Sequence, residues 1–291
     1  WCYNHSRYIL DDGFNETGED RSGAYTYPRQ FLPHAALTYE ALQNKYLYAS
    51  VSRGFSLPSV AETLTPEGAI NTDIKPETGI SYEVGVKATW LDKKLYTELA
   101  IYSIQVDNLL VAERVAEDQY VGVNAGKTNH DGIEFLVNYD QNLSANWALK
   151  PYASIAINNY KFDEFVNNDT DYSGNDLTGV PDNVLNFGLD VVNYERFKFS
   201  TNYRHVGMIP LNDANALYSE SYDLVNLRAD YSFNIFSNLA GTVYSGVNNV
   251  FDANYAAQIL PNATGFGGAS PRFYYPGDPV NWYAGLKIMI N

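Results

Sequence analysis

Cysteine and histidine are scarce in this sequence, which contains one cysteine and four histidines in 291 residues. A single cysteine, Cys2, forms no disulfide within the chain, and zinc sites built on cysteine pairs are excluded. The histidines show no spacing typical of a metal site; they are His5, His34, His130 and His205. No resident cofactor is therefore predicted.

Basic residues and long apolar runs are scarce as well. Lysine and arginine number 19 against 34 acidic residues, which gives a formal net charge of -15. Nucleic-acid binding depends on cations that meet phosphates, so nucleic acid is not expected as a partner. No apolar run approaches the roughly 18 residues of a membrane-spanning helix. That absence excludes membrane helices only, because a transmembrane β-strand needs about 9 to 11 residues with every second one apolar.

What the sequence does contain is a regular alternation of apolar and polar residues, without helical periodicity. In one segment Tyr82, Val84 and Trp90 share one face, whereas Glu83 and Lys87 share the other. Repeated along the chain, this pattern predicts about twelve strands, near residues 1–9, 28–42, 44–54, 79–91, 94–108, 127–140, 145–158, 183–194, 196–208, 222–235, 238–249 and 280–290.

Short polar turns and long loops alternate between these strands. The long loops span residues 10–27, 55–78, 109–126, 159–182, 209–221 and 250–279. An up-and-down β-barrel produces this order directly, with all turns on one rim and all loops on the other. In outer-membrane barrels the short turns face the periplasm and the long loops face outside the cell.

The alternation by itself does not say which face of the sheet is inside. A soluble barrel, sandwich or propeller hides its apolar face, whereas a membrane barrel turns it toward lipid and turns the polar face toward a wet lumen. The strand lengths, the large polar loops and the aromatic strand ends, which suit interfacial girdles, favour the membrane barrel. The aromatic residues in question are Tyr82, Trp90, Trp147, Tyr231, Phe233 and Trp282. We therefore predict an all-β, antiparallel transmembrane β-barrel.

Four stretches add a more specific signal. They are YLYASVSRGFSLPSVAETL (46–64), IKPETGISYEVGVKATWLDKKLYTELAIYSIQVDNLLV (74–111), NAGKTNHDGIEF (124–135), and GVNNVFDANY (246–255) followed by FYYPGDPVNWYAGLKI (273–288). In this order and at this spacing, they resemble the C-terminal half of the barrel of a TonB-dependent outer-membrane receptor, most closely the ferric-siderophore type. The resemblance runs from about residue 1 to the end.

The resemblance implies a location, partners and a function. The family's barrel has 22 strands around a plugged lumen, so residues 1–291 are expected to form its C-terminal part, without the plug domain and the first barrel strands. Such a receptor lies among the lipids of the bacterial outer membrane and binds a small iron chelate. The TonB–ExbB–ExbD system acts on it through the plug.

Within GVNNVFDANY, a turn is predicted where the penultimate strand ends. Asn248 and Asn249 tolerate the left-handed backbone needed to leave a strand, and Asp252 can bond backbone amides in the turn. We therefore expect the chain to enter its last long loop here.

If the receptor resemblance holds, loop aromatics and cations are the natural ligand contacts. Aromatic faces and arginine donors would hold a chelate and its oxygen atoms. The candidates are Arg53, Phe55, Arg114, Tyr120, His130, Arg272, Tyr274 and Tyr275. The alternative is that Arg53 and Arg272 bond carboxylates of the lumen and that Tyr274 and Tyr275 lie at the rim.

The acidic stretch 167–176 resembles the start of a calcium-binding loop. Its twelfth position would be Val180 rather than glutamate, so a complete EF-hand is excluded. A weaker calcium loop or a solvated acidic turn are the two interpretations, and the candidate ligands are Asp169, Asp171, Ser173 and Asp176.

Two other functions compete with the receptor. A passive porin or structural barrel would conduct ions without energy coupling. A twelve-strand outer-membrane lipase would need a serine–histidine pair on the lipid-facing side near the outer rim. His205, with Ser200 and Ser219 as the nearest serines in sequence, shows no diagnostic spacing. We therefore do not expect an enzyme.

Overall fold

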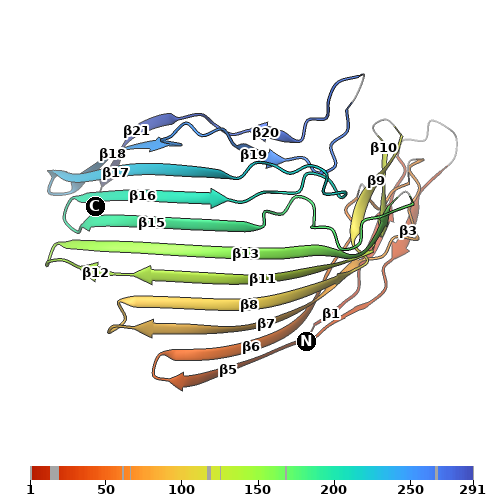
Figure 1. Ribbon diagram of the computed structural model, residues 1–291, viewed down its shortest axis with the longest axis horizontal. Helices are drawn as coiled ribbons and strands as arrows, with labels where there is room; N and C mark the ends of the chain where they lie inside the picture. Colours follow the sequence, from red (N-terminus) through yellow and green to blue (C-terminus); the bar gives the residue numbers. More distant parts are fainter. Residues whose placement is uncertain are drawn as a thin grey trace.

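A curved antiparallel sheet of 13 strands dominates the structure (Figure 1). The computed structural model describes residues 2–13, 20–60, 62–65, 67–116, 119–124, 126–167, 169–265 and 268–290. Neighbours in the sheet follow chain order, namely β5 (His34–Leu42), β6 (Lys45–Ser56), β7 (Glu77–Trp90), β8 (Leu95–Asp107), β11 (Gly126–Tyr139), β13 (Trp147–Asn167), β15 (Asn183–Asn193), β16 (Phe197–Val206), β17 (Tyr222–Phe236), β18 (Leu239–Asn248) and β21 (Asn281–Ile290). Strands β5 and β21 form the two edges of the sheet.

These strands confirm the pattern predicted from the alternation. Most lie within a few residues of a predicted strand, and short turns alternate with long connections along the sheet (Figure 1). Two predicted bounds are wrong: the strand predicted at 28–42 starts in the sheet only at His34, and the strand predicted at 145–158 continues to Asn167. Tight turns close one end of the sheet, which we call the turn end, and the long connections gather at the other, the loop end (Figure 1). No helix among the described residues is long and apolar enough to cross a membrane.

The predicted strand 1–9 is wrong as a single strand of the sheet. Residues there form β1 (Cys2–Asn4) and β2 (Arg7–Leu10), which pair with β4 (Gln30–Leu32) and β3 (Gly23–Thr26). Pro33 separates β4 from β5 because proline has no N–H to donate to a ladder. The Pro33 carbonyl still accepts a hydrogen bond from the Arg53 amide at 3.0 Å, so the segment of β1 to β4 stays attached to β6.

Two predicted loops contain hairpins of their own. Strands β9 (Leu110–Ala116) and β10 (Gln119–Asn124) pair with each other in the first, and β19 (Ala256–Ile259) pairs with β20 (Tyr274–Pro276) in the second. Strand β13 continues past the sheet and pairs with β14 (Thr170–Asp171) at the loop end, while β12 (Gln141–Asn142) pairs with it at the turn end. The loop end is therefore more ordered than the sequence suggested.

Asn249 anchors the exit from β18, as the turn prediction required. It has a left-handed backbone with φ 48, and Asp252 has φ 53, whereas Asn248 stays within the strand. The Asn249 side chain is only 3% exposed. Its amide group donates to the carbonyls of Ala253 and Asp278, and its oxygen accepts from the Ala253 amide. Asp252 accepts from the Val280 amide at 2.8 Å, so both ends of the last loop are held together.

The two faces of the sheet differ in chemistry. The apolar face carries side chains such as Val84, Ile101, Ile133 and Ile157, which are 53%, 50%, 42% and 51% exposed. The polar face carries the alternate residues, such as Glu134 between Ile133 and Phe135. So large an exposed apolar surface is unusual for a soluble protein and is normal where lipid covers the wall.

Labelling of single cysteines tests this assignment of faces. In a Cys2→Ser background, we expect Glu134→Cys to react with a water-soluble maleimide and Ile133→Cys to be protected from it by lipid. The same contrast should hold for Asn138→Cys against Phe135→Cys and Val137→Cys. Strong aqueous labelling at 133, 135 and 137 with protection at 134 and 138 would reverse the two faces.

Candidate functional site

Tyrosine rings lie over glycines on the polar face. A β-carbon added to Gly132 would lie 2.3 Å from Tyr102, its partner across β8 and β11. The ring therefore occupies the space that a side chain would fill, and the close fit holds neighbouring strands in register. The same arrangement recurs along the sheet in the pairs Tyr48–Gly85, Tyr152–Gly188, Tyr244–Gly285 and Tyr283–Gly246.

One of these tyrosines belongs to a larger group that we call the histidine–tyrosine cluster, formed by Tyr102, Thr128, His130, Asn158 and Tyr160. The rings of His130 and Tyr160 stack with centroids 4.5 Å apart and an interplanar angle of 13°. The hydroxyls of Tyr160 and Tyr102 lie 2.7 Å apart, and Tyr102 also donates to Asn158 Oδ1 at 3.4 Å. His130 Nε2 lies 2.9 Å from Thr128 Oγ1.

Strand register assembles this cluster from three adjacent strands. His130 in β11 lies opposite Ile104 in β8 and Tyr160 in β13, and Gly132 lies opposite Tyr102 and Asn158. The glycine leaves room for Tyr102 to reach across β11 toward β13. The result is a set of aromatic and hydrogen-bonding groups at the loop end of the polar face.

A pocket of about 320 Å³ shares residues with the cluster, and we call it the outer-loop pocket. Three consecutive residues of β13, Asn158, Asn159 and Tyr160, line it. The connections from β14 to β15 and from β16 to β17 supply the rest, which are Asp176, Leu177, Val180, Pro181, Asp182, Met208, Pro210 and Tyr218. Asp176 Oδ1 lies 3.2 Å from Lys161 Nζ, and its Oδ2 accepts from the Tyr218 hydroxyl. Burial raises the pKa of Tyr218, and the Asp176 carboxylate raises it further.

Side chains of asparagine and aspartate hold the loops around this pocket. Asp213 accepts from the hydroxyl of Thr178 and from the amide of Asn262, so it joins three loops. Asn215 accepts from the Asp176 amide at 2.6 Å and donates to its carbonyl at 3.0 Å. The loops that line the pocket are therefore held together by side-chain hydrogen bonds.

Several charged groups of the polar face are paired across or along the strands. Salt bridges join Lys87 to Glu98 at 2.6 Å, Lys198 to Asp190 at 2.8 Å and Arg228 to Asp230 at 2.7 Å. Pairs this exposed contribute little to stability, on the order of 0 to 1 kcal/mol each. Their effect is to neutralise charge along the wall. In contrast, Arg204, Glu83 and Glu134 form no salt bridge with any described residue.

Among the sequence-predicted ligand residues, His130 lies in the cluster. Arg53 lies at the loop end of β6, where the register pairs it with Ile80. Arg53 and Phe55 are separated from Leu47 and Val51 by even numbers of residues in β6, so their side chains lie on the same, apolar face. The structure therefore does not bring Arg53 or Phe55 to the polar face with His130.

The other predicted residues lie in two separate hairpins. Tyr120 and Arg114 face each other in the backbone register of β10 and β9, and their side chains lie outside the described residues. Arg272 is exposed just before β20, and Tyr274 and Tyr275 within that strand are 56% and 57% exposed. No described contact joins these three to the histidine–tyrosine cluster.

The candidate calcium ligands use their oxygens within the loop. Asp171 Oδ1 accepts from the Ser173 amide at 2.9 Å, and hydrogen bonds from Ser173 lower the pKa of Asp171. The Ser173 hydroxyl accepts from the Phe165 amide. Asp176 is engaged as described above, and Asp169 has φ 60 in an exposed turn. In the described part of the chain, no group of three or more histidine, cysteine, aspartate or glutamate side chains is placed to hold a metal ion. The calcium loop stays a prediction.

Two observations concern residues that sequence reasoning missed or left open. The predicted ligand residues did not include Tyr102, Asn158 or Tyr160. The signal that could have identified them is their position on the polar face, next to a glycine on the neighbouring strand. His205, considered for the lipase alternative, bonds Asp223 at 2.8 Å, and Tyr203 donates to the same oxygen. The described partner of His205 is therefore an aspartate, which also bonds a tyrosine. It is not the serine that the lipase alternative would need.

Comparisons with known proteins agree with this architecture. Residues 3–250 match the family model described as "TonB dependent receptor-like, beta-barrel". The chain is 27% identical over 249 residues to the ferric-pyoverdine BN7/BN8 receptor of Pseudomonas putida, covering 78% of this chain and 26% of that protein. It is 26% identical over 219 residues to the ferrichrome outer membrane transporter/phage receptor of Escherichia coli (strain K12), covering 72% and 28%. The chain thus spans little more than a quarter of these relatives.

Solved structures share the fold. The ferric citrate transporter FecA in the unliganded form matches with a TM-score of 0.73 at 19% identity, covering 99% of this chain and 41% of that one. The siderophore receptor PiuA from Acinetobacter baumannii matches with a TM-score of 0.69 at 15% identity, covering 98% and 39%. These likenesses confirm the predicted partial barrel.

Substitution of Gly132 tests the tyrosine–glycine fit. Gly132→Ala places a methyl group against Tyr102 and should destabilise the barrel by about 1 to 3 kcal/mol, the usual cost of overpacking. Gly54→Ala is the matched control, because a β-carbon there meets nothing within 4 Å. Denaturant unfolding of the refolded barrel measures both. Adding Tyr102→Ala should make Gly132→Ala nearly neutral, and equal losses at Gly132 and Gly54 would contradict the packing argument.

Proposed function

Because the chain belongs to the TonB-dependent receptor β-barrel family, whose members lie in the bacterial outer membrane, we propose that it forms the wall and outer loops of a receptor for a metal chelate. The polar face lines the lumen, the apolar face meets lipid, and the loop end faces outside the cell. Members of this family are transporters rather than enzymes.

The observation that carries the proposal is the histidine–tyrosine cluster on the polar face, which shares Asn158 and Tyr160 with the outer-loop pocket. Aromatic faces and hydroxyl, amide and imidazole groups suit the rings and oxygen atoms of a chelate. Arg204 adds an exposed guanidinium on the same face, with no described ion-pair partner. The printed names of the relatives, ferric-pyoverdine receptor and ferrichrome transporter, support an iron chelate of the siderophore type.

We further propose that residues 1–291 are the C-terminal part of a barrel of about 22 strands. The outer edges of β5 and β21, which pair with no other strand of the described residues, support this, because a strand edge in lipid needs a partner for its backbone groups. The remaining strands and a plug domain would come from outside this chain. TonB–ExbB–ExbD would act on that plug, so energy coupling is not assigned to residues described here.

Uptake of radioactive iron tests the proposal in the complete receptor. We expect one class of ferric chelate (hydroxamate, catecholate or carboxylate) to enter cells that carry the receptor and TonB, and uptake to stop when TonB is deleted. Uptake that persists without TonB would identify a passive pore instead.

A histidine substitution locates the binding site. His130→Ala removes the ring stacked on Tyr160 and should weaken chelate binding roughly tenfold, the effect of about 1.4 kcal/mol. His205→Ala is the matched control, because His205 lies on the apolar face. Equilibrium binding to outer-membrane vesicles measures both variants, and equal affinities would remove the cluster from the ligand site.

A further inference from the structure

The negative charge of this chain is concentrated in its long connections. The six long connections predicted from the sequence contain 22 of the 34 acidic residues but only 5 of the 19 basic residues. The rest of the chain is close to neutral, with 12 acidic and 14 basic residues. The net charge of -15 therefore belongs to the loop end, where the long connections gather (Figure 1).

Many of these carboxylates face solvent, and few have a basic partner. Exposed acidic residues come from four different connections and include Asp73, Asp169, Asp171, Glu220 and Asp278. In the described part of the chain, the loop-end salt bridges of lysine or arginine are those of Lys127 with Glu164 and of Lys161 with Asp176. A surface dominated by one sign of charge attracts ligands of the opposite sign and speeds their association.

The outer-loop pocket has the same sign of charge. Its described lining residues include Asp176 and Asp182 but no lysine or arginine. Lys161 binds Asp176, whereas Asp182 forms no salt bridge with a described residue. An anionic ligand would therefore meet a carboxylate there without a compensating cation.

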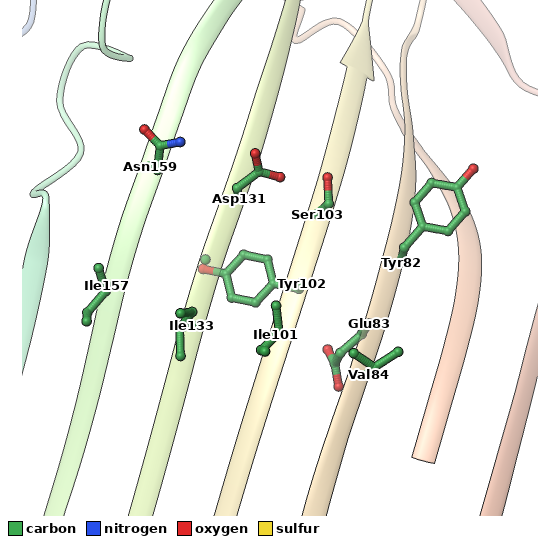
Figure 2. Close-up of a pocket in the computed structure, with 11 residues that line it drawn as sticks. Tyr82, Glu83, Val84, Ile101, Tyr102, Ser103, Asp131, Ile133, Ile157 and Asn159 are labelled. Carbon is green, nitrogen blue, oxygen red and sulfur yellow. The ribbon is translucent and has the colours of Figure 1, made fainter. Parts of the chain in front are cut away.

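The histidine–tyrosine cluster beside this pocket offers aromatic faces. Figure 2 looks onto a depression of the apolar face across β7, β8, β11 and β13, and it shows the Tyr102 ring extending from β8 across β11. The Tyr102 hydroxyl lies 2.7 Å from that of Tyr160, whose ring stacks on His130. The face of an aromatic ring attracts a cation through the ring quadrupole. The cluster therefore suits a cationic or neutral group better than an anionic one.

Arg204 does not reverse this balance on the polar face. It lies opposite Asn186, which lies opposite Ser154, four residues before Asn158 in β13. This places the guanidinium on the turn side of the cluster. Glu83 and Glu134, the other polar-face charges without a described salt bridge, are both negative.

We propose that the receptor selects a chelate of net positive charge, which carries a free ammonium beside its iron-binding groups. The inference rests on the proposed function, because it names the charge of the chelate that the cluster receives. Three hydroxamates balance the charge of ferric iron, so a pendant ammonium makes such a complex cationic. Three catecholates leave the complex strongly anionic, and the acidic loops would repel it.

Association rates of matched chelates test this in the complete receptor, held in nanodiscs of uncharged phosphatidylcholine. One linear ferric trihydroxamate is used with its terminal amine free, acetylated or succinylated, which makes it cationic, neutral or anionic; ferric complexes of a tricatecholate and of citrate complete the panel. At about 10 mM salt we expect the cation to associate roughly tenfold faster than its succinylated form. At about 1 M salt the ratio should fall below about twofold, because the Debye length shrinks from about 30 Å to about 3 Å.

The outcomes separate this inference from the proposed function. Equal rates for the three hydroxamates at low salt, or a preference for the succinylated, catecholate or citrate complex, would overturn the charge selection and leave a chelate receptor in place. If the receptor binds none of these chelates, the proposed function itself fails.

Two matched double variants locate the charge. Asp169→Lys with Glu220→Lys reverses two exposed loop-end carboxylates and should slow the cationic chelate roughly threefold at low salt. Asp92→Lys with Glu195→Lys makes the same change at the turn end and should leave the rate unchanged. The pairs are comparable because Asp169 and Asp92 both have positive φ values, of 60 and 53, and all four residues are exposed.

Heat-dependent gel mobility verifies that both double variants are folded. Equal slowing by the two folded variants would show that the acidic loops do not select the chelate.

Discussion

Hydrogen bonding between the backbones of neighbouring strands is the constraint on which the rest of this structure depends. Inside a lipid layer no water is present to bond a backbone N–H or C=O, so each strand must satisfy these groups through its neighbours. The ladder runs without interruption from β5 to β21. It fixes the spacing of adjacent strands and makes successive side chains point to opposite faces. An apolar face toward lipid and a polar face toward the lumen follow directly.

The ladder also determines how the polar face can be used. Neighbouring strands are only about 4.8 Å apart, so a large side chain on one strand needs a small one beside it. Gly132 and Gly188 provide that space for Tyr102 and Tyr152. Where a histidine is added to such a pair, as at His130, the rings and hydroxyls assemble into a compact group at the loop end. The same close spacing brings opposite charges together toward the turn end, where Lys87 meets Glu98.

Beyond the sheet, side-chain amides and carboxylates take over part of the ladder's role. Asn249 bonds the backbone at both ends of the last loop, and Asp213 and Asn215 tie the neighbouring loops together. Short polar side chains suit this task because they bond backbone groups at close range and tolerate left-handed conformations. Asn215 and Asn249 both have positive φ values, of 51 and 48. The chelate site proposed here would thus rest on loops that are held in place.

Local patterns in the sequence were enough to predict most strands, their two faces and the turn at Asn249, because alternation and turn chemistry are local properties of the chain. It also carried the family resemblance that the comparisons confirmed. Contacts between residues far apart in the chain set the features that local patterns do not encode. The predicted strand 1–9 became two short strands outside the main sheet, because β1 pairs with β4 and β2 pairs with β3, and Pro33 separates β4 from β5. Tyr160 meets His130 only because the register of β11 and β13 aligns residues 30 positions apart. The depression on the apolar face across β7, β8, β11 and β13 likewise exists only where these four strands align their side chains, and that alignment is a property of the assembled sheet.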